Sequence, residues 1–182
     1  YQTHIAYQEE DADGIVWTYI VKNGEAEIYG DVNTSTIPEE TTGAITIPSS
    51  LGGYPVTSIG DRAFSGCYNL TNITIPDSVT SIGEGAFEYC YGLTSITIPD
   101  SVTSIGYGAF AGCYEAIDLE TILGVELVDG WVVDYCYEER PVNLDLTGAR
   151  GIAERAFSGC DSLTNITIPD SVTHIGDYAF EH

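Results

Sequence analysis

The chain has 182 residues, and 28 acidic against five basic side chains give it a formal net charge of −23. A surface with this much negative charge repels nucleic-acid phosphates and anionic membranes. We therefore expect neither nucleic acid nor a membrane as a partner. No apolar run approaches the ~20 residues that span a bilayer, which argues against membrane insertion, and no signal peptide is recognisable. Because the chain starts at Tyr1 and has no Met, we expect a processed form or a fragment.

The first predicted element is an N-terminal β cap over residues 1–43. Its segment from Trp17 to Ile28 contains Lys22-Asn-Gly-Glu25, and Asn-Gly favours the type I′ turn of a two-residue β-hairpin. We therefore expect a β-hairpin ahead of the remaining chain.

Residues 44–182 repeat with a period of about 23 residues. One copy runs from Leu70 to Cys90, and a nearly identical copy runs from Leu93 to Cys113. Such a period is typical of a solenoid, whose stacked units bury a core that one unit cannot bury alone. The fold class expected is a mainly β solenoid of short strands with about six turns. The cysteines mark the period, at intervals of 23, 23, 23 and 24 residues: Cys67, Cys90, Cys113, Cys136 and Cys160.

Each unit contains Ile-Thr-Ile, an alternation that predicts a short, half-exposed strand. The proline after it ends the strand, because proline donates no hydrogen bond to a ladder. A glycine after the next isoleucine predicts a bend with positive φ. These glycines are Gly60, Gly83, Gly106 and Gly176. Four columns of apolar residues follow from the period: Ile73, Ile96 and Ile166; Ile75, Ile98 and Ile168; Ile59, Ile82, Ile105, Ile152 and Ile175; Phe64, Phe87, Phe110, Phe157 and Phe180.

A divergent stretch covers about residues 115–140. Leu93 and Leu163 are 70 residues apart, three periods plus one, so this stretch still occupies whole turns. Asp129-Gly130 lies between two apolar runs and predicts a hairpin, which either lies in the stack or projects from it. The last copy, from Leu163, is truncated, so we expect more repeats or further domains in the full-length protein.

The repeat resembles the BspA-type leucine-rich repeat, whose unit is LxxIxIPxxVxxIGxxAFxxC. The match covers residues 44–114 and 144–180, and the segment around Trp17 resembles the cap that precedes such repeats. The resemblance implies secreted or surface-attached proteins, mostly bacterial, that bind host proteins, matrix or other cells, and it implies no catalytic residues. It therefore places the chain outside the cell or at the cell surface.

The cysteines allow two interpretations. One rung of a solenoid rises about 4.8 Å, within the usual Cα–Cα range of a disulfide. Yet five is an odd number, and no Cys-x-x-Cys spacing suggests zinc. We favour the second interpretation, in which each cysteine is a small buried hydrophobe, one in each turn.

Threonines form a hydroxyl-rich face. Those between the paired isoleucines, Thr46, Thr74, Thr97 and Thr167, point away from the core. Thr71, Thr94 and Thr164 precede the last three of these by three residues. The face would recognise a protein or glycan. Ice binding is a narrower alternative, although the threonines are one per strand rather than paired, and threonine is also simply a good exposed strand residue. The candidates are Thr46, Thr71, Thr74, Thr94, Thr97, Thr164 and Thr167.

Tyrosines cluster beside the cysteines. With Trp131 they would form an aromatic strip for sugars or a partner, since Tyr and Trp are favoured interface anchors. The alternative is that each ring only covers the edge of a turn. The candidates are Tyr68, Tyr89, Tyr91, Tyr114, Tyr135 and Tyr137.

Acidic residues form two further groups. Asp77 and Asp100 lie one rung apart, and Asp11 and Asp13 belong to an Asp-x-Asp-Gly fragment of a calcium loop. Bound Ca²⁺ would relieve the repulsion between them. We favour the alternative, in which these are ordinary solvated turn residues that bond their own backbone and no cofactor is required.

No catalytic signature is present: there is no Gly-x-Ser-x-Gly, P-loop or His-Glu-x-x-His motif. We therefore expect a non-catalytic extracellular binding or adhesion module for a protein or matrix ligand. The alternative is a carbohydrate-binding or spacer module of a larger secreted enzyme, and an enzyme in its own right is the third option. The partner would be a protein or glycan of a host, matrix or cell surface.

Overall fold

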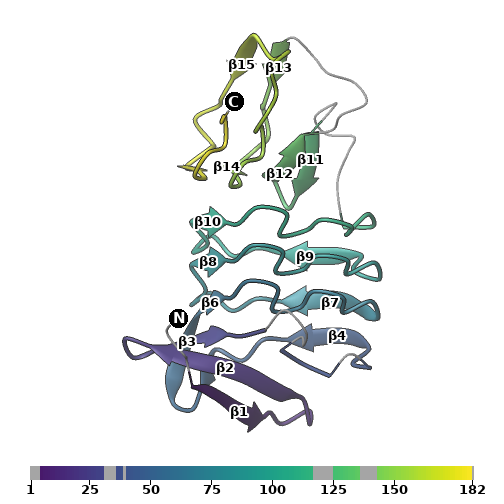
Figure 1. Cartoon of the computed structure of the whole chain (residues 1–182), viewed down its shortest axis with the longest axis vertical. Coiled ribbons are helices and arrows are strands. Elements are labelled where there is room, and N and C mark those ends of the chain that lie inside the picture. The colour runs from purple at the N-terminus through teal and green to yellow at the C-terminus, as the bar shows by residue number, and fades with distance from the viewer. Residues whose placement is uncertain (1–4, 31–35, 39, 117–124, 136–142, 182) are drawn as a thin grey trace.

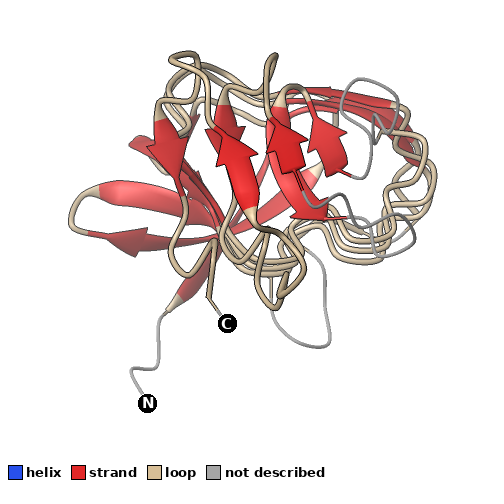
Figure 2. Cartoon of the chain, turned by 90° about the horizontal axis from the view of Figure 1, so that it is seen from above, coloured by secondary structure: helices blue, strands red, loops and turns tan. Residues whose placement is uncertain are grey.

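The computed structural model describes all residues except 1–4, 31–35, 39, 117–124, 136–142 and 182. The described part is a stack of short β-strands of about five turns, close to the six expected. The predicted class, a mainly β leucine-rich-repeat solenoid, is confirmed. The turns of successive rungs lie over one another when the stack is seen from above (Figure 2). No helix among the described residues is long and apolar enough to cross a membrane.

Three antiparallel strands form the N-terminal end of the stack (Figure 1): β1 (Ala6–Glu10), β2 (Val16–Lys22) and β3 (Glu25–Ile28). Asn23 and Gly24 between β2 and β3 have φ of 54° and 85°, both positive as the predicted type I′ turn requires. Strand β3 then pairs in parallel with the first rung of the solenoid, and Trp17 on β2 is fully buried. The hairpin therefore shields the first rung from water.

Each rung of the first stack contributes to two sheets, in which successive rungs pair in parallel. One sheet consists of β4 (Gly43–Thr46), β7 (Leu70–Thr74) and β9 (Ser95–Thr97). The other continues from β3 through β6 (Tyr54–Ile59), β8 (Ser81–Ile82) and β10 (Ser104–Ile105), with β5 (Ser50–Leu51) beside β6. Ile73 is opposite Ile96, and Ile82 is opposite Ile105, so the register follows the sequence period.

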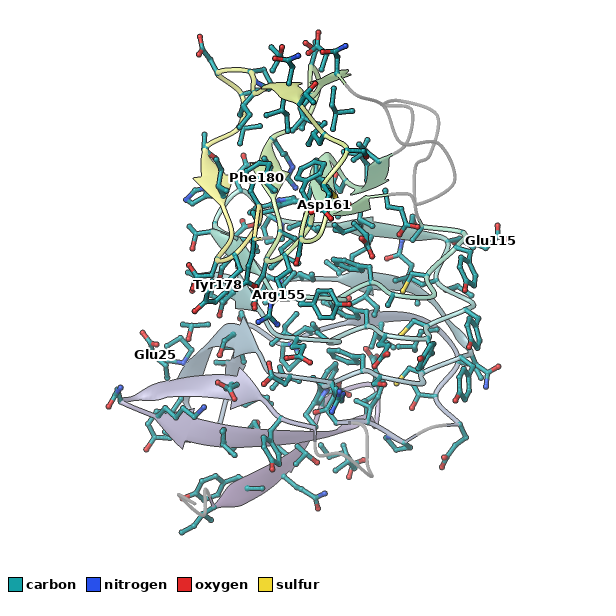
Figure 3. The ribbon with its side chains drawn as sticks, turned by 45° about the horizontal axis from the view of Figure 1, so that its top comes forward. Glu25, Glu115, Arg155, Asp161, Tyr178 and Phe180 are labelled. Carbon is teal, nitrogen blue, oxygen red and sulfur yellow. The ribbon has the colours of Figure 1, made fainter. Side chains whose placement is uncertain are left out.

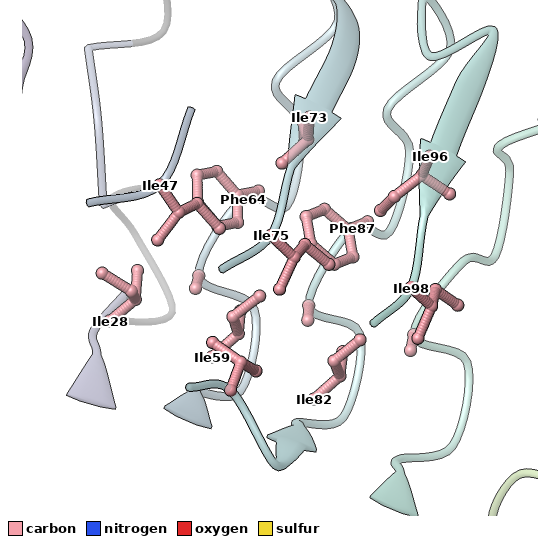
Figure 4. Close-up of a cluster of buried hydrophobic side chains, with 14 of the residues drawn as sticks. Ile28, Ile47, Ile59, Phe64, Ile73, Ile75, Ile82, Phe87, Ile96 and Ile98 are labelled. Carbon is pink, nitrogen blue, oxygen red and sulfur yellow. The ribbon is translucent and has the colours of Figure 1, made fainter. Parts of the chain in front are cut away.

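The predicted apolar columns fill the space between the two sheets (Figure 4). The rings of Phe64, Phe87 and Phe110 are stacked, with centroids 5.2 and 5.3 Å apart. The columns are buried except in the last rung, where Ile168 and Ile175 are partly exposed because no described rung covers them. Each rung is thus stabilised by the apolar surface of its neighbours.

Cysteine packing follows the second interpretation for the residues that can be assessed. Cys67, Cys90, Cys113 and Cys160 are all buried, and Cys136 lies outside the described residues. The thiols of Cys90 and Cys113 donate to the carbonyl oxygens of Phe64 and Phe87, at 3.1 and 3.0 Å. Both thus act as small core residues with a local hydrogen bond.

The reason predicted for the repeated glycines is wrong. None of Gly60, Gly83, Gly106 and Gly176 has a positive φ. A Cβ at these positions would instead lie 2.4–2.7 Å from a backbone atom of the preceding rung, so glycine is needed for close approach. Positive φ occurs two residues after these glycines, at Arg62, Gly85, Gly108 and Tyr178, and at Arg155, two residues after Ala153 in the same position of its rung. It also occurs just before the described cysteines, at Gly66, Tyr89, Gly112 and Gly159.

The divergent stretch contains the predicted hairpin, formed by β11 (Val125–Val128) and β12 (Trp131–Tyr135). Its turn residues Asp129 and Gly130 have φ of 47° and 77°. The hairpin lies within the stack, because β12 pairs with the following rung. Trp131 and Val133 pack into the core of the first stack, whereas Val132 packs into a second core. Because successive side chains of β12 point to opposite sides, this strand separates the two hydrophobic cores.

The second stack consists of β13 (Asn143–Asp145), β14 (Gly151–Ile152), β15 (Asn165–Thr167) and β16 (His174–Ile175). Its strands β13 and β15 run across the direction of β7 and β9 (Figure 1). The amide of Ala153 donates to Val132 and that of Glu154 to Ile105, at 2.8 and 2.9 Å. The rung after the hairpin is therefore bonded to both the hairpin and the first stack.

Arg150 joins the hairpin to the two stacks. Its Nη2 donates to the carbonyl oxygen of Ile98 at 2.6 Å and to Oδ2 of Asp129 at 2.8 Å, and its Nε donates to the carbonyl oxygen of Asp129 at 2.7 Å. The same Asp129 Oδ2 accepts from the amide of Ile98 at 2.8 Å. These side chains thus satisfy the backbone of Ile98, just past the end of β9.

Candidate functional site

One face of the first stack carries most of the predicted binding residues. In each rung the chain leaves a buried cysteine, exposes a tyrosine, buries a leucine and then exposes threonines on either side of a buried isoleucine. The rungs of β7 and β9 show the whole order, and the rung of β4 shows only its second half. We name this surface the tyrosine–threonine face and define it as residues 41–47, 68–75 and 91–98 with Tyr89 and Tyr114.

Threonines form two columns on this face. Thr46, Thr74 and Thr97 are opposite one another in the register of β4, β7 and β9, and all three are exposed. Thr94 lies one rung above Thr71, and its amide and hydroxyl both donate to the Thr71 carbonyl oxygen at 3.0 Å.

Two other predicted threonines lie apart. Thr164 and Thr167 are exposed on the second stack, where Thr167 is opposite Asp145 rather than another threonine. They therefore do not continue the columns of the first stack.

Tyrosines form a third column beside the threonines. The rings of Tyr68 and Tyr91 are stacked with centroids 5.5 Å apart, and those of Tyr91 and Tyr114 are stacked at 6.4 Å. Tyr89 is tilted against Tyr91 at 6.0 Å. The residues stay open to solvent, with exposed fractions of 53% for Tyr68, 46% for Tyr89, 49% for Tyr91 and 74% for Tyr114. Exposed rings gathered in this way are typical of an interaction surface.

The other predicted aromatic residues do not belong to this column. Trp131 is only 2% exposed, and its ring lies over Gly151, where a Cβ would come within 2.5 Å of the ring. Its prediction as a surface ligand contact is corrected: Trp131 is a packing residue between the hairpin and β14. Tyr137 and the side chain of Tyr135 lie outside the described residues.

Charge is absent from the repeated segments of the face. Residues 41–47, 68–75 and 91–98 contain no Asp, Glu, Lys or Arg, in a chain with 28 acidic residues. Carboxylates border the face instead: Asp77 and Asp100 follow the prolines that end the rungs, and Glu88 precedes Tyr89. The charge of Glu88 and its hydrogen bond to the phenol raise the pKa of Tyr89, so this hydroxyl stays protonated at neutral pH.

The predicted calcium candidates contact protein groups. Asp11 accepts hydrogen bonds from the amides of Asp13 and Ile15 at 2.9 Å and from the indole of Trp17 at 2.7 Å. Burial alone would raise the pKa of Asp11, but these hydrogen bonds outweigh it and lower the pKa. Asp100 faces Arg150 at 3.4 Å, and Asp77 is exposed. Among the described residues, no group of three or more His, Cys, Asp or Glu is placed to hold a metal.

A groove of about 570 Å³ lies on the other sheet of the first stack and has no counterpart among the predicted sites. Its described residues come from the cap, from the rungs of β6, β8 and β10, and from the rungs of β14 and β16, which are far apart in sequence. Lys22, its one basic lining residue, is paired with Glu27 at 3.0 Å. Its serines and carboxylates are Ser58, Ser81, Ser104, Glu27, Asp61, Glu84, Glu154 and Asp177. Negative charge thus gathers here and is absent from the tyrosine–threonine face.

Comparisons with known proteins agree with this architecture. The model of the BspA type leucine rich repeat region matches residues 41–138 and 135–182, with six copies. A solved leucine rich repeat protein of T. pallidum is similar over 97% of this chain, with 26% identity and a TM-score of 0.52. A leucine rich cell surface protein of Faecalibacterium prausnitzii is similar over 99% of this chain, with 32% identity and a TM-score of 0.55. No curated protein matches significantly. The chain covers 64% and 47% of these two structures, less than two thirds of either.

Proposed function

Because the chain belongs to the BspA-type leucine-rich repeat family, we propose that it is a non-catalytic adhesion module that binds a component of a host, matrix or cell surface. The tyrosine–threonine face is the binding surface in this proposal. The observation that carries it is an exposed, ordered column of tyrosines beside two columns of threonines, in a sheet kept free of charge. An exposed aromatic surface is costly in water unless a partner covers it.

An extracellular location is part of the proposal. One similar solved structure is described as a cell surface protein. The net charge of −23 supports solubility outside the cell but provides no attraction to anionic membranes. We therefore propose that the module reaches its ligand through specific contacts rather than through long-range electrostatic attraction.

A binding role is also favoured over catalysis by the environment of the titratable groups. His174, the one histidine among the described residues, stacks on Trp131 at 6.4 Å. Cys90 is buried, and its neighbour Cys113 together with burial raises its pKa, which makes it a poor nucleophile. Cys90 is therefore not prepared for nucleophilic chemistry.

The test measures attachment of the labelled protein to surfaces coated with extracellular matrix that contains both proteins and polysaccharides. We expect saturable binding that is lost when Tyr91 and Tyr114 are changed to Ala together. Tyr107→Ala is the matched control, since Tyr107 is 47% exposed, like Tyr91, but lies outside the face. Absence of binding, or an equal loss in the control, would overturn the proposal.

A further inference from the structure

We infer that the ligand of the tyrosine–threonine face is a neutral, extended polysaccharide that lies along the tyrosine column and across the rungs. This inference rests on the proposed function and names the chemical class of its ligand. Three observations carry it: the distribution of charge, the chemistry of the three columns and the direction in which they repeat.

The distribution of charge argues against ionic ligands. An anionic glycan needs basic residues, and the four that the structure describes all pair with carboxylates: Lys22 with Glu27, Arg62 with Glu84 and with Glu88 at the border of the face, Arg150 with Asp129 and with Asp100 at the same border, and Arg155 with Glu181. Arg155 also lies over the ring of Tyr178 in the second stack, 5.3 Å from its centroid (Figure 3). A basic ligand would instead be drawn to carboxylates, which gather in the groove on the other sheet.

The lack of arginine and tryptophan on the face argues against a typical protein ligand. Protein interfaces use arginine and tryptophan together with tyrosine as anchors, while other charged residues are depleted from the interface core. The repeated segments of the face contain neither arginine nor any other charged residue. A neutral ligand does not need charged partners on the face, and no charge has to be desolvated when it binds.

The chemistry of the columns fits a sugar chain. A pyranose ring has faces of C–H bonds and a rim of hydroxyls, so it needs an apolar platform beside hydrogen-bonding groups. The tyrosine column provides the apolar surface through the exposed parts of its stacked rings, each of which combines an apolar body with a polar hydroxyl. Beside it, the Thr94 hydroxyl donates to Thr71 and keeps its lone pairs for a ligand. The Asn72 amide donates to the Ser95 hydroxyl at 2.8 Å, which fixes the orientation of both groups.

The direction of the columns fits a polymer. Tyr68, Tyr91 and Tyr114 follow one another along the stack at 5.5 and 6.4 Å, one from each rung. Each rung offers the same groups again, so a chain of repeating units gains one similar contact for each step. A single sugar would make only one of these contacts. We therefore expect affinity to rise with chain length, as for any ligand that engages several linked sites.

The experiment uses the full chain and neutral oligosaccharides of one to six units, namely cello-, xylo-, manno-, laminari- and malto-oligosaccharides. Heparin and polygalacturonate are the charged comparisons. Isothermal titration calorimetry should detect binding of at least one neutral series, with affinity that rises with length. Because no ion pair is involved, the affinity should stay within about twofold between low salt and 0.5 M NaCl. Binding only to the charged polymers, or binding that salt abolishes, would overturn the inference.

Variants locate the binding. Tyr91→Ala should weaken binding about fivefold to tenfold, as loss of one aromatic contact predicts, whereas Tyr107→Ala should leave it unchanged. Thr94→Ala should weaken binding relative to Thr103→Ala. These two are matched, because each hydroxyl bonds the carbonyl oxygen of the threonine one rung below, at 3.0 and 3.2 Å. Equal melting temperatures within each pair would show that the weaker binding is not caused by a loss of folding.

The failure of this inference is distinguishable from failure of the proposed function. Attachment to matrix that is lost in the Tyr91 and Tyr114 variant, but resists enzymatic removal of polysaccharide, would identify a protein ligand. That result would overturn the polysaccharide inference and leave the adhesion module standing. Absence of attachment to every matrix and glycan would overturn both.

Discussion

Arg150 should hold the two stacks together, and its replacement by Ala tests this role. The guanidinium makes three hydrogen bonds of 2.6–2.8 Å to Ile98 and Asp129. Arg150→Ala would leave the carbonyl oxygen of Ile98 without this donor and the Asp129 carboxylate without its counter-ion. Both groups lie at the boundary between the cores, where loss of a partner is only partly compensated by water.

The expected loss is about 3 kcal/mol of unfolding free energy. A hydrogen bond to a charged group contributes about 1.5–3 kcal/mol, and we reduce this to about 1 kcal/mol for each bond because solvent reaches the site. The Arg150 side chain is 28% exposed and that of Asp129 is 38% exposed. The ion pair with Asp100 at 3.4 Å adds little, since the Asp100 side chain is fully exposed.

Urea unfolding monitored by tryptophan fluorescence measures this loss. Trp17 reports on the first core and Trp131 on the boundary, so a Trp17→Phe background isolates the signal of the boundary. Arg62→Ala is the control, because its ion pairs are 3.9 Å long and exposed, and it should cost less than about 0.5 kcal/mol. We expect Arg150→Ala to unfold the second stack before the first, which appears as two transitions when both tryptophans are present. A loss no larger than that of the control would refute the reasoning.

Three further predictions concern stability. Burial and a neighbouring carboxylate raise the pKa of Glu126, so the ionised form of this side chain opposes folding. Glu126→Gln should therefore raise the unfolding free energy at pH 7, and this gain should vanish below the ordinary pKa of 4.5. Urea titrations at both pH values would measure the difference. Gly106→Ala should cost about 1–3 kcal/mol in thermal unfolding because its Cβ would meet the rung below, whereas Ala153→Gly should cost about 0.5–1 kcal/mol; equal losses would contradict the steric explanation. Cys90 and Cys113 should react with a thiol reagent only as fast as the protein unfolds, and rapid labelling of the native protein would show that they are accessible.

Local signals were sufficient for the repeating part of the fold. The period fixes which residues share a column, and a strand of alternating residues needs no long-range information beyond it. The two hairpins were predictable for the same reason, since Asn23-Gly24 and Asp129-Gly130 adopt the positive φ values that their turns need. The threonine columns at Thr74 and Thr97 follow directly from strand alternation.

The boundary between the stacks was not predictable, because it depends on pairing across the divergent stretch. Trp131 was expected at the surface, but its strand pairs with β14 and its ring covers Gly151. A signal was present in the sequence: Gly151 replaces the serine found at Ser81 and Ser104, and Ala153 replaces the repeated glycine. These two exceptions mark the rung that has a hairpin beneath it instead of a regular neighbour.

In a solenoid, the residue type at one position recurs on every rung. This recurrence explains the threonine columns of the tyrosine–threonine face in part, but it does not explain the tyrosine column. A charge at the position of Thr74 would recur about 4.8 Å away on the next rung, where like charges destabilise a sheet. The threonine columns are therefore explained in part by the sheet itself, while Asp77 and Asp100 show that exposed turns tolerate repeated acids. No such requirement explains the exposed tyrosines, since a small polar residue in the same turn would cost less to expose. The tyrosine variants, rather than the threonine variants, are accordingly the decisive test of ligand binding.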